Sequence, residues 1–332
     1  MGKLNKKYDF DITVNPATTY AGSQALPYVT AVVKSNDTIA KGYVRQMDGL
    51  SGSKAVISSL VTTDPIVGAS GACSFSDAGT TTLGERVLTL TDLKVNREVC
   101  RATVWPTWVG ENMKRESSEG LPNSFSDFLL EVVANQASAQ IENAMWVADT
   151  GGIFGAGFVS NDGQFDQTGL DASACADFTQ VTMNSGTATD NTNIDDALAD
   201  VYASVTGSHP GLEFREGFGF YMNNKMFSFY AQYLAGVGTG QGINSLGLTL
   251  NPDTLSYLGH PIYRCPGMPD DCIVATYIDN LVVGSSLGTD LVEAKIIPTY
   301  LYDGSDNVRV VMNFGFGVQT GIGTDGVVGC TF

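Results

Sequence analysis

The strongest constraint on the fold is one long amphipathic helix predicted over residues 125–149. Its apolar side chains recur three or four positions apart, as one face of an α-helix requires: Phe128, Leu129, Val132, Val133, Ala137, Ile141, Ala144, Met145 and Ala148. The polar face between them carries Glu131, Gln136, Gln140, Glu142 and Asn143. Ser124 or Ser126 can cap its start, and Gly151 with Gly152 ends it. A helix of this length measures about 37 Å and should span the width of its domain.

The residues before this helix predict extended structure. Residues 1–60 are punctuated by glycine and proline, which indicates an arm with short strands or a turn of helix. Residues 62–84 are rich in Gly, Ser, Thr and Asp and cannot bury much apolar surface, so we expect an excursion from the body. Residues 86–95 and 99–105 predict two long strands beside this excursion.

The residues after the helix mix helices and strands, which predicts an α+β fold. A polar insertion over 151–192 precedes a second helix, which begins at Ile194 with Thr192 or Asn193 as its cap. The following elements are predicted in chain order: a buried strand over 217–222, a helix over 226–234, a flexible glycine loop over 236–242, and strands over 261–264, 272–277, 281–284, 291–301 and 307–318, with a turn at 303–306.

Charge is distributed unevenly along the chain. The formal net charge is −17, yet residues 1–115 carry 13 Lys and Arg against 10 Asp and Glu, whereas residues 116–332 carry 5 against 25. Because opposite potentials steer association, this asymmetry favours an assembly in which the basic N-terminal portion of one copy lies on the acidic body of another. The acidic body argues against tight nucleic-acid binding by phosphate neutralisation, which needs clustered Lys and Arg.

The N-terminus predicts a chain that stays in a cytosol. Tyr8-Asp9-Phe10-Asp11 stands where a signal peptide needs an apolar stretch. No apolar run approaches the roughly 18 residues of a membrane span. In a cytosol we expect reduced cysteines, and the chain has six: Cys73, Cys100, Cys175, Cys265, Cys272 and Cys330. None lies in a Cys-x-x-Cys pair, so we expect no zinc site.

Several patterns that could carry chemistry lack the context that chemistry needs. His209 and His260 each precede a proline. No Gly-x-Ser-x-Gly elbow accompanies them, so we interpret both as turn positions at the start of a strand. Glu213 and Glu216 could form an acid–base pair, but nothing in the surrounding sequence desolvates either one. The glycines of 236–242 follow a helix instead of a strand, which favours a loop over a nucleotide site.

Metal binding and aromatic stacking have equally ordinary explanations. Aspartates that could bind calcium fall in two groups: Asp162, Asp166 and Asp171 in the insertion, and Asp190, Asp195 and Asp196 at a helix start. Neither group matches the twelve-residue calcium loop, and acids at a helix start also suit the helix dipole. Trp105, Trp108 and Trp146 could stack on sugars or bases, but core or subunit-interface positions are favoured. We assign no catalytic, cofactor-binding or metal-binding residue and expect no enzyme.

The order of elements is distinctive: an arm, a two-stranded excursion, one very long helix, an α+β lobe and returning strands. The helix runs through Glu142-Asn143-Ala144-Met145-Trp146 into Asp149-Thr150-Gly151. Leu258-Gly259-His260-Pro261-Ile262-Tyr263 leads to Met268-Pro269, and the strand-turn stretch 272–290 follows. These features resemble the HK97-like major capsid proteins of tailed bacteriophages, across nearly the whole chain.

The resemblance implies a division of the chain into five parts. These are an N-terminal arm with the first peripheral strand over 1–60, an extended β-hairpin loop (E-loop) over 61–120, a peripheral domain with the long spine helix over 121–176, an axial domain over 177–290, and returning peripheral strands over 291–332. Family members with a scaffolding segment carry it as a charged helix before the arm. None precedes the arm here, so a separate scaffold is expected.

The resemblance also implies a function. The chain would self-assemble into hexamers and pentamers of an icosahedral shell that encloses phage double-stranded DNA by containment. Its partners would be further copies, a portal, a separate scaffolding protein and a possible decoration protein, with no membrane and no cofactor. It would reside in the virion capsid after assembly in the host bacterial cytoplasm. Two alternatives stay open: an encapsulin-type nanocompartment shell, and an acidic β-rich hydrolase or calcium-binding surface protein.

Overall fold

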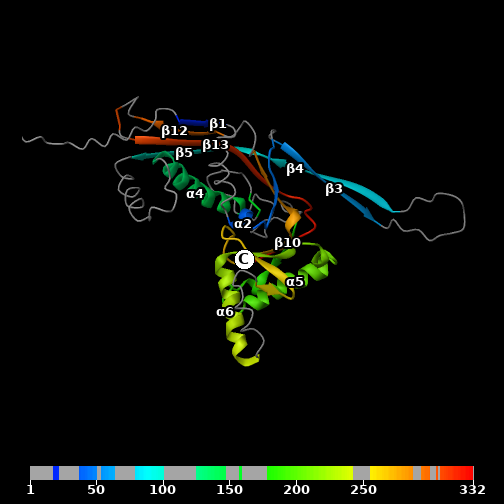
Figure 1. Ribbon diagram of the computed structural model, residues 1–332. Coiled ribbons are helices and arrows are strands. Elements are labelled where there is room, and N and C mark those ends of the chain that lie inside the picture. The colour runs from blue at the N-terminus through cyan, green and yellow to red at the C-terminus, as the bar shows by residue number, and fades with distance from the viewer. Residues whose placement is uncertain are drawn as a thin grey trace, which may run out of the picture.

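The computed structural model describes residues 18–21, 37–50, 54–63, 79–100, 125–146, 157–158, 178–241, 255–286, 293–299, 304–305 and 307–331. Two six-stranded sheets and one separate two-stranded sheet organise these residues. Figure 1 shows the first sheet with helix α4 beneath it, the second sheet with α5 and α6 further below, and the two-stranded hairpin reaching outward to one side.

The first sheet is built around the long strand β13 (Asn307–Thr320). Both β12 (Glu293–Pro298) and β5 (Thr91–Cys100) pair antiparallel with its first part, and β11 (Leu281–Ser285) pairs with its end. Two short strands complete the sheet at its margins: β1 (Thr18–Ala21) beside β12, and β2 (Arg45–Met47) parallel to β11. Strands from both ends of the sequence therefore share one sheet.

The second sheet is built from the middle and the end of the chain. Its strands lie in the order β6 (Thr179–Thr182), β14 (Val327–Cys330), β10 (Cys272–Tyr277), β7 (Phe218–Met222), β9 (His260–Arg264) and β8 (Ser256–Tyr257). Helix α5 (Ile194–Ser208) buries its apolar face against this sheet, with Ile194, Ala197, Leu198, Val201 and Val205 all fully inaccessible. This core covers the face of the second sheet that packs against α5.

Helix α4 (Phe125–Trp146) confirms the long amphipathic helix; residues 147–149 lie outside the described residues. Its apolar side chains, including Leu130, Val133 and Met145, share one core cluster with the inward residues of β12 and β13. Trp146 is completely buried, as expected for a core residue, and its ring centroid lies 5.9 Å from that of Tyr221 in β7. The end of α4 therefore joins the core of the first sheet to the second sheet.

The hairpin of β3 (Lys54–Thr63) and β4 (Thr80–Thr89) corresponds to the predicted excursion, but begins earlier in the sequence than expected. The strand predicted over 86–95 is divided at Leu90, where β4 ends and β5 begins one residue later. Leu90 is buried, and its side chain lies beside Gly284 of the first sheet. Burial of this side chain fixes the point where the chain leaves the hairpin. Residues 64–78 and 101–105 lie outside the described residues.

Helix α6 (Asn224–Gln241) overturns the predicted loop over residues 236–242, because the helix that was expected to end at Leu234 continues to Gln241. Glycine in a helix is less favourable than alanine by only about 1 kcal/mol. The first turns of α6 are anchored by Met226, Phe227 and Tyr230 in the core. Because these core contacts anchor the helix, α6 continues through Gly236, Gly238 and Gly240 despite their low helix propensity. None of the described helices is long and apolar enough to span a membrane.

Most other predicted elements are confirmed, including α5, β7 and the run from β9 to β13. The short strands β6 and β14 were not predicted, because four residues carry too little alternation to be recognised. Their pairing depends on the tertiary fold: β6 and β14 run parallel although nearly 150 residues separate them in the sequence.

A disulfide between Cys272 and Cys330 corrects the expectation that all six cysteines are reduced. The two residues lie directly opposite each other in the antiparallel β10–β14 ladder, with Cα atoms 4.3 Å apart. That distance is just short of the Cα separations of about 4.4–6.8 Å that disulfides usually span. The sequence could not show this pairing because β14 was not recognised as a strand. Cys100 and Cys265 are free, whereas Cys73 and Cys175 lie outside the described residues.

Candidate assembly surface and sheet junction

The β3–β4 hairpin presents an apolar face to solvent. The register pairs Val56 with Val87 and Leu60 with Leu83. Residues that stand opposite each other, or two apart along a strand, share a face of the hairpin. These four side chains therefore share one face as two cross-strand pairs, with the exposed pair Ser58–Glu85 between them. Their exposed fractions are 59% for Val56, 68% for Leu60, 59% for Leu83 and 46% for Val87.

The opposite face of the hairpin is held on the body of the protein. Leu88 is fully buried at the base of β4, and Arg86 donates a hydrogen bond of 3.0 Å to the Thr320 hydroxyl at the end of β13. A side-chain carbon at Gly317 would clash with the backbone carbonyl of Thr89, so β13 needs glycine there to let β4 approach. The base of the hairpin is thus fixed, and its outward apolar face is left without a partner in the described residues.

This arrangement suits a protein–protein contact. A two-stranded hairpin has little stability by itself in water, and paired aliphatic side chains on its open face gain free energy only when another surface covers them. Exposed apolar residues that gather on one face of a folded domain favour an interaction site. We therefore define Val56, Leu60, Leu83 and Val87 as the hairpin face, and treat it as the candidate assembly surface.

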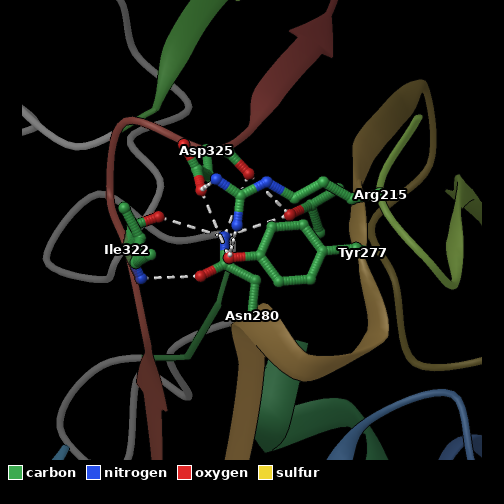
Figure 2. A network of polar contacts seen from close by, with 6 residues as sticks. Arg215, Tyr277, Asn280, Ile322 and Asp325 are labelled. Atoms are coloured by element: carbon green, nitrogen blue, oxygen red, sulfur yellow. Dashed lines mark hydrogen bonds and ion pairs between the residues drawn. The ribbon is translucent and has the colours of Figure 1, made fainter. Parts of the chain in front are cut away.

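A network of polar contacts lies where the chain passes between the two sheets (Figure 2). The 3₁₀ turn η4 (Ile278–Asn280) connects β10 to β11, and residues 321–326 connect β13 to β14. The Asn280 side chain is 1% exposed and joins these two passages. Its amide nitrogen lies 3.0 Å from the carbonyl oxygens of both Ile322 and Asp325, and its Oδ1 accepts a 2.6 Å hydrogen bond from the Ile322 amide.

Arg215 adds a third segment to this junction. It precedes β7, and its guanidinium lies 3.0 Å from the Asp325 carboxylate and 5.0 Å from the ring centroid of Tyr277. The Tyr277 hydroxyl donates to the same carboxylate at 3.2 Å. Burial, with the nearby negative charge of Asp325, raises the pKa of Tyr277 to about 12, so the phenol stays protonated and remains a donor.

A buried carboxylate, Glu142, joins α4 to two other segments. It accepts hydrogen bonds from the amide and hydroxyl of Thr38 in α2 (Asp37–Ala40), from the Gly267 amide and from the Trp146 indole. Glu142 is 5% exposed, which corrects its placement on the polar face of the helix. Burial raises the pKa of Glu142, and the hydrogen bonds that it accepts oppose that rise.

The histidine and glutamate candidates are held in ordinary structural contacts. His260 begins β9, as predicted, and packs its ring 5.0 Å from that of Phe218. His209 instead follows the end of α5, where its Nε2 lies 2.5 Å from the Thr179 hydroxyl. Its expected position at a strand start is therefore wrong. Glu213 accepts a 2.6 Å hydrogen bond from Tyr202, and Glu216 is exposed.

The aspartates considered for calcium are similarly engaged where the structure describes them. Asp190 accepts hydrogen bonds from the hydroxyl and amide of Thr192, which lower the pKa of its carboxyl. Asp195 accepts one from Tyr233 at 3.0 Å. Asp162, Asp166 and Asp171 lie outside the described residues, as do Trp105 and Trp108. Among the residues that are described, no group of three or more His, Cys, Asp or Glu side chains could hold a metal ion.

Sequence reasoning did not identify the hairpin face, the Asn280 junction or the buried Glu142. The β-branched composition of residues 54–63 was an available signal for β3. Alternation alone cannot tell which face of a strand meets solvent, and one asparagine among many polar residues gives no signal at all. These features depend on which distant segments meet, and only the folded chain shows that.

Comparison with known proteins places the fold. No family model and no curated protein sequence matches the chain. Among solved structures, one from Gordonia phage Cozz shares 16% identity at a TM-score of 0.53, covering 89% of this chain and 86% of that one. The capsid of Myoviridae phage XM1 shares 12% identity at a TM-score of 0.53, with 89% and 92% covered.

The procapsid of satellite phage P4, which includes its size determination protein, shares 12% identity at a TM-score of 0.53. The alignment covers 92% of this chain and 98% of that one. Similarity over nearly the full length of each chain, at identities this low, establishes the fold. The chain has the α+β architecture of HK97-type phage capsid proteins, as the resemblance in its sequence implied.

Proposed function

We propose that this chain is the major capsid subunit of a tailed bacteriophage and that it assembles with copies of itself into a closed shell. The observation that carries the proposal is the exposed hairpin face on a chain with a capsid fold. Four aliphatic side chains that meet water in the free chain would be covered when the hairpin lies on a neighbouring copy. Each would contribute roughly 1 kcal/mol or more on burial.

In this proposal the parts of the chain keep the roles that the sequence suggested. Residues 1–60 form the arm and first peripheral strand, 61–120 the extended loop, 121–176 the peripheral domain, 177–290 the axial domain and 291–332 the returning strands. Strand β3 lengthens the extended loop toward Lys54, whereas β5, which lies within 61–120, pairs with β13 in the body. The net positive charge of residues 1–115 against the strongly acidic remainder supports docking of one copy's N-terminal portion on another.

The shell would consist of hexamers and pentamers and enclose double-stranded DNA without specific binding, in the virion. A portal and a separate scaffold would complete it, and a decoration protein could bind its outer surface. The acidic body supports containment instead of tight binding, because it repels phosphate. The subunit would carry out no chemistry, and its free energy of interaction would go into contacts between copies.

The proposal is tested by paired substitutions of Leu60 and Leu83 on the hairpin face. Leu60→Thr with Leu83→Thr keeps strand-forming side chains but removes most of the apolar surface of one cross-strand pair. We expect this variant to fold and to form closed particles at least tenfold less efficiently, measured by light scattering and negative-stain microscopy. The matched control, Leu60→Met with Leu83→Met, keeps an apolar face and should assemble as the native chain does.

The outcomes separate the remaining alternatives. Normal particle yield from the threonine variant would contradict the role of the hairpin face. DNA inside particles isolated from infected or producing cells would support a phage capsid. A protein cargo in place of DNA would indicate a nanocompartment shell instead.

A further inference from the structure

A hollow of about 370 Å³ lies against the side of α4, next to the start of α2 and to Pro266, which follows β9. Its polar lining comes from Asp37 of α2 and from Asn135, Ser138, Glu142 and Asn143 of α4. Three of the helical residues follow one another at three- and four-residue spacing and therefore share one face of the helix. Within the described residues no basic side chain belongs to the lining, so the hollow is acidic and rich in hydrogen-bond acceptors.

The Ser138 hydroxyl is a polar group of this hollow that the chain leaves without a bond. Ser138 is 3% exposed, and its Oγ has no hydrogen-bond partner among the described residues. A buried hydroxyl in this state is rare in folded proteins, because nothing compensates the loss of its bonds to water. A ligand that donates an N–H to this oxygen would provide the bond that the fold does not.

The Glu142 carboxylate gives the hollow a second acceptor. Its Oε1 accepts three hydrogen bonds, whereas its Oε2 accepts one within the described part of the chain, from the Thr38 amide at 3.4 Å. A carboxylate oxygen has two lone pairs, so Oε2 can accept a further donor. Asp37, which is exposed, adds a second carboxylate where the hollow opens to solvent.

These acceptors favour a ligand that carries positive charge and several N–H donors. A primary ammonium group has three donors and no acceptor, whereas a guanidinium fork pairs best with both oxygens of one carboxylate. The acceptors of the hollow stand on separate residues, which favours the ammonium group. No group of three metal-ligating side chains lies here or elsewhere in the described residues, and the hollow is much larger than a metal ion.

The sequence indicates where such a group would come from. Lys41 follows α2 in the same chain, but its ammonium lies 6.0 Å from the Tyr43 ring centroid and Lys41 does not line the hollow. Residues 1–115 carry 13 of the 18 Lys and Arg residues, whereas the hollow belongs mainly to the acidic part of the chain. Opposite charge therefore favours the N-terminal portion of a second copy as the donor.

We propose that this hollow binds a primary ammonium group through Ser138, Glu142 and Asp37, and that in the assembled particle a lysine side chain from residues 1–115 of a neighbouring copy supplies it. The second part rests on the proposed function, whereas the first part does not. Binding would satisfy the Ser138 hydroxyl and neutralise charge in the acidic lining. The hollow would then be a specific contact between copies, separate from the apolar hairpin face.

The site is tested first by titrating the unassembled full-length chain at about pH 8, where a primary ammonium stays charged. The ligand is n-butylammonium, which copies the end of a lysine side chain. Tetramethylammonium is the control ligand, because it has the same charge but no N–H donor. The Trp146 indole is the reporter, since it donates to Glu142 at 3.3 Å. Replacing Trp105 and Trp108 with Phe leaves Trp146 as the only tryptophan, so one indole NMR signal remains.

We expect n-butylammonium to shift this signal saturably and tetramethylammonium to cause less than about a tenth of that shift. Ser138→Ala and Asp37→Asn should each weaken the affinity at least about threefold. Glu131→Gln is the matched control, because it removes an exposed carboxyl of α4 that does not line the hollow, and it should bind as the native chain does.

The serine variant also separates binding from folding. Ser138→Ala should not lower the midpoint of denaturant unfolding, because the hydroxyl that it removes has no partner among the described residues. The absence of a saturable shift would overturn the site. Equal shifts with both cations, or native affinity in both Ser138→Ala and Asp37→Asn, would overturn it as well.

The source of the ammonium group is tested in particles assembled from equal amounts of unlabelled and heavy-isotope-labelled chain. A carbodiimide joins a carboxylate directly to an amine that touches it, so mass spectrometry of the digested particles identifies the lysine beside Asp37. We expect a lysine of residues 1–115, in peptide pairs of mixed label. Pairs of a single label only, or no pair at Asp37, would overturn the assignment to a neighbouring copy. If the native chain forms no closed particle, the proposed function fails, and the titration still decides whether the hollow binds an ammonium group.

Discussion

At the scale of single residues, Glu142 shows how burial and hydrogen bonding compete. Its carboxylate accepts hydrogen bonds from three donor residues on two other segments and on its own helix, yet burial still raises its pKa above the ordinary value of 4.5. The folded chain therefore binds a proton at Glu142 more tightly than the unfolded chain does. The stability that this residue contributes is greatest at low pH and is lost as the pH rises through the folded pKa.

Replacing Glu142 with glutamine removes this titration while keeping the size of the side chain. We expect the stability of the native chain, relative to the Glu142→Gln variant, to fall as the pH rises from 4.5 to 8. Denaturant unfolding of both proteins across this range measures the difference. A difference that stays constant with pH, or that grows as the pH rises, would contradict the buried and perturbed state of Glu142.

The Cys272–Cys330 disulfide makes a second prediction at this scale. It closes a loop of 58 residues that includes β11, β12 and β13. The chain-entropy model assigns such a loop a stabilisation of about 4 kcal/mol. A reductant should lower the free energy of unfolding of the native chain by an amount of this order, but should leave Cys330→Ser unaffected. Cys100→Ser, at an exposed free cysteine, should keep the full response to the reductant.

This disulfide also bears on where the chain matures. In a reducing cytosol the two cysteines would stay as free thiols. The disulfide would form once the protein meets an oxidising environment. No response of the native chain to the reductant would show that the cysteines remain reduced, as the sequence alone suggested.

At the scale of elements, α4 carries the contact between the two sheets at its last residue. Trp146 is fully buried, with its ring 5.4 Å from Phe158 and 5.9 Å from Tyr221. Trp146→Ala should therefore cost about 3–5 kcal/mol of stability, as large-to-small substitutions of buried aromatics do. Val132→Ala, on the same helix but 37% exposed, should cost less than about 1 kcal/mol. Equal losses by denaturant unfolding would contradict the position of Trp146 in the core.

The elements also show how far a sequence can be read. The period of α4, the alternation in β13 and the continuous, largely apolar run of β10 were sufficient, because each pattern is clear within its own element. The continuation of α6 through Gly236, Gly238 and Gly240 was missed, because a local glycine signal was outweighed by anchoring in the core. The candidate site was missed for a related reason: Leu60 and Leu83 pair only across the hairpin, and Asn280 meets Ile322 only in the folded chain.

At the scale of the whole molecule, the parts combine into a body with a projecting hairpin (Figure 1). The first sheet carries the hairpin and α4, the second carries α5 and α6, and the junction around Asn280 holds them together. Charge is divided along the chain and not by sheet: the N-terminal third is net positive and the remainder strongly acidic, and the first sheet takes strands from both parts. Both features are expected of a subunit whose stable state is an assembly, in which apolar and oppositely charged surfaces cover each other.

The most direct test of this account is the mass of the purified full-length chain, by size-exclusion chromatography with light scattering, followed by negative-stain microscopy of the same peak. We predict rings or closed particles that weaken as salt is raised, because the charge contribution between copies is screened. A 35.1 kDa monomer at every salt concentration, with or without a co-expressed scaffold, would contradict the account.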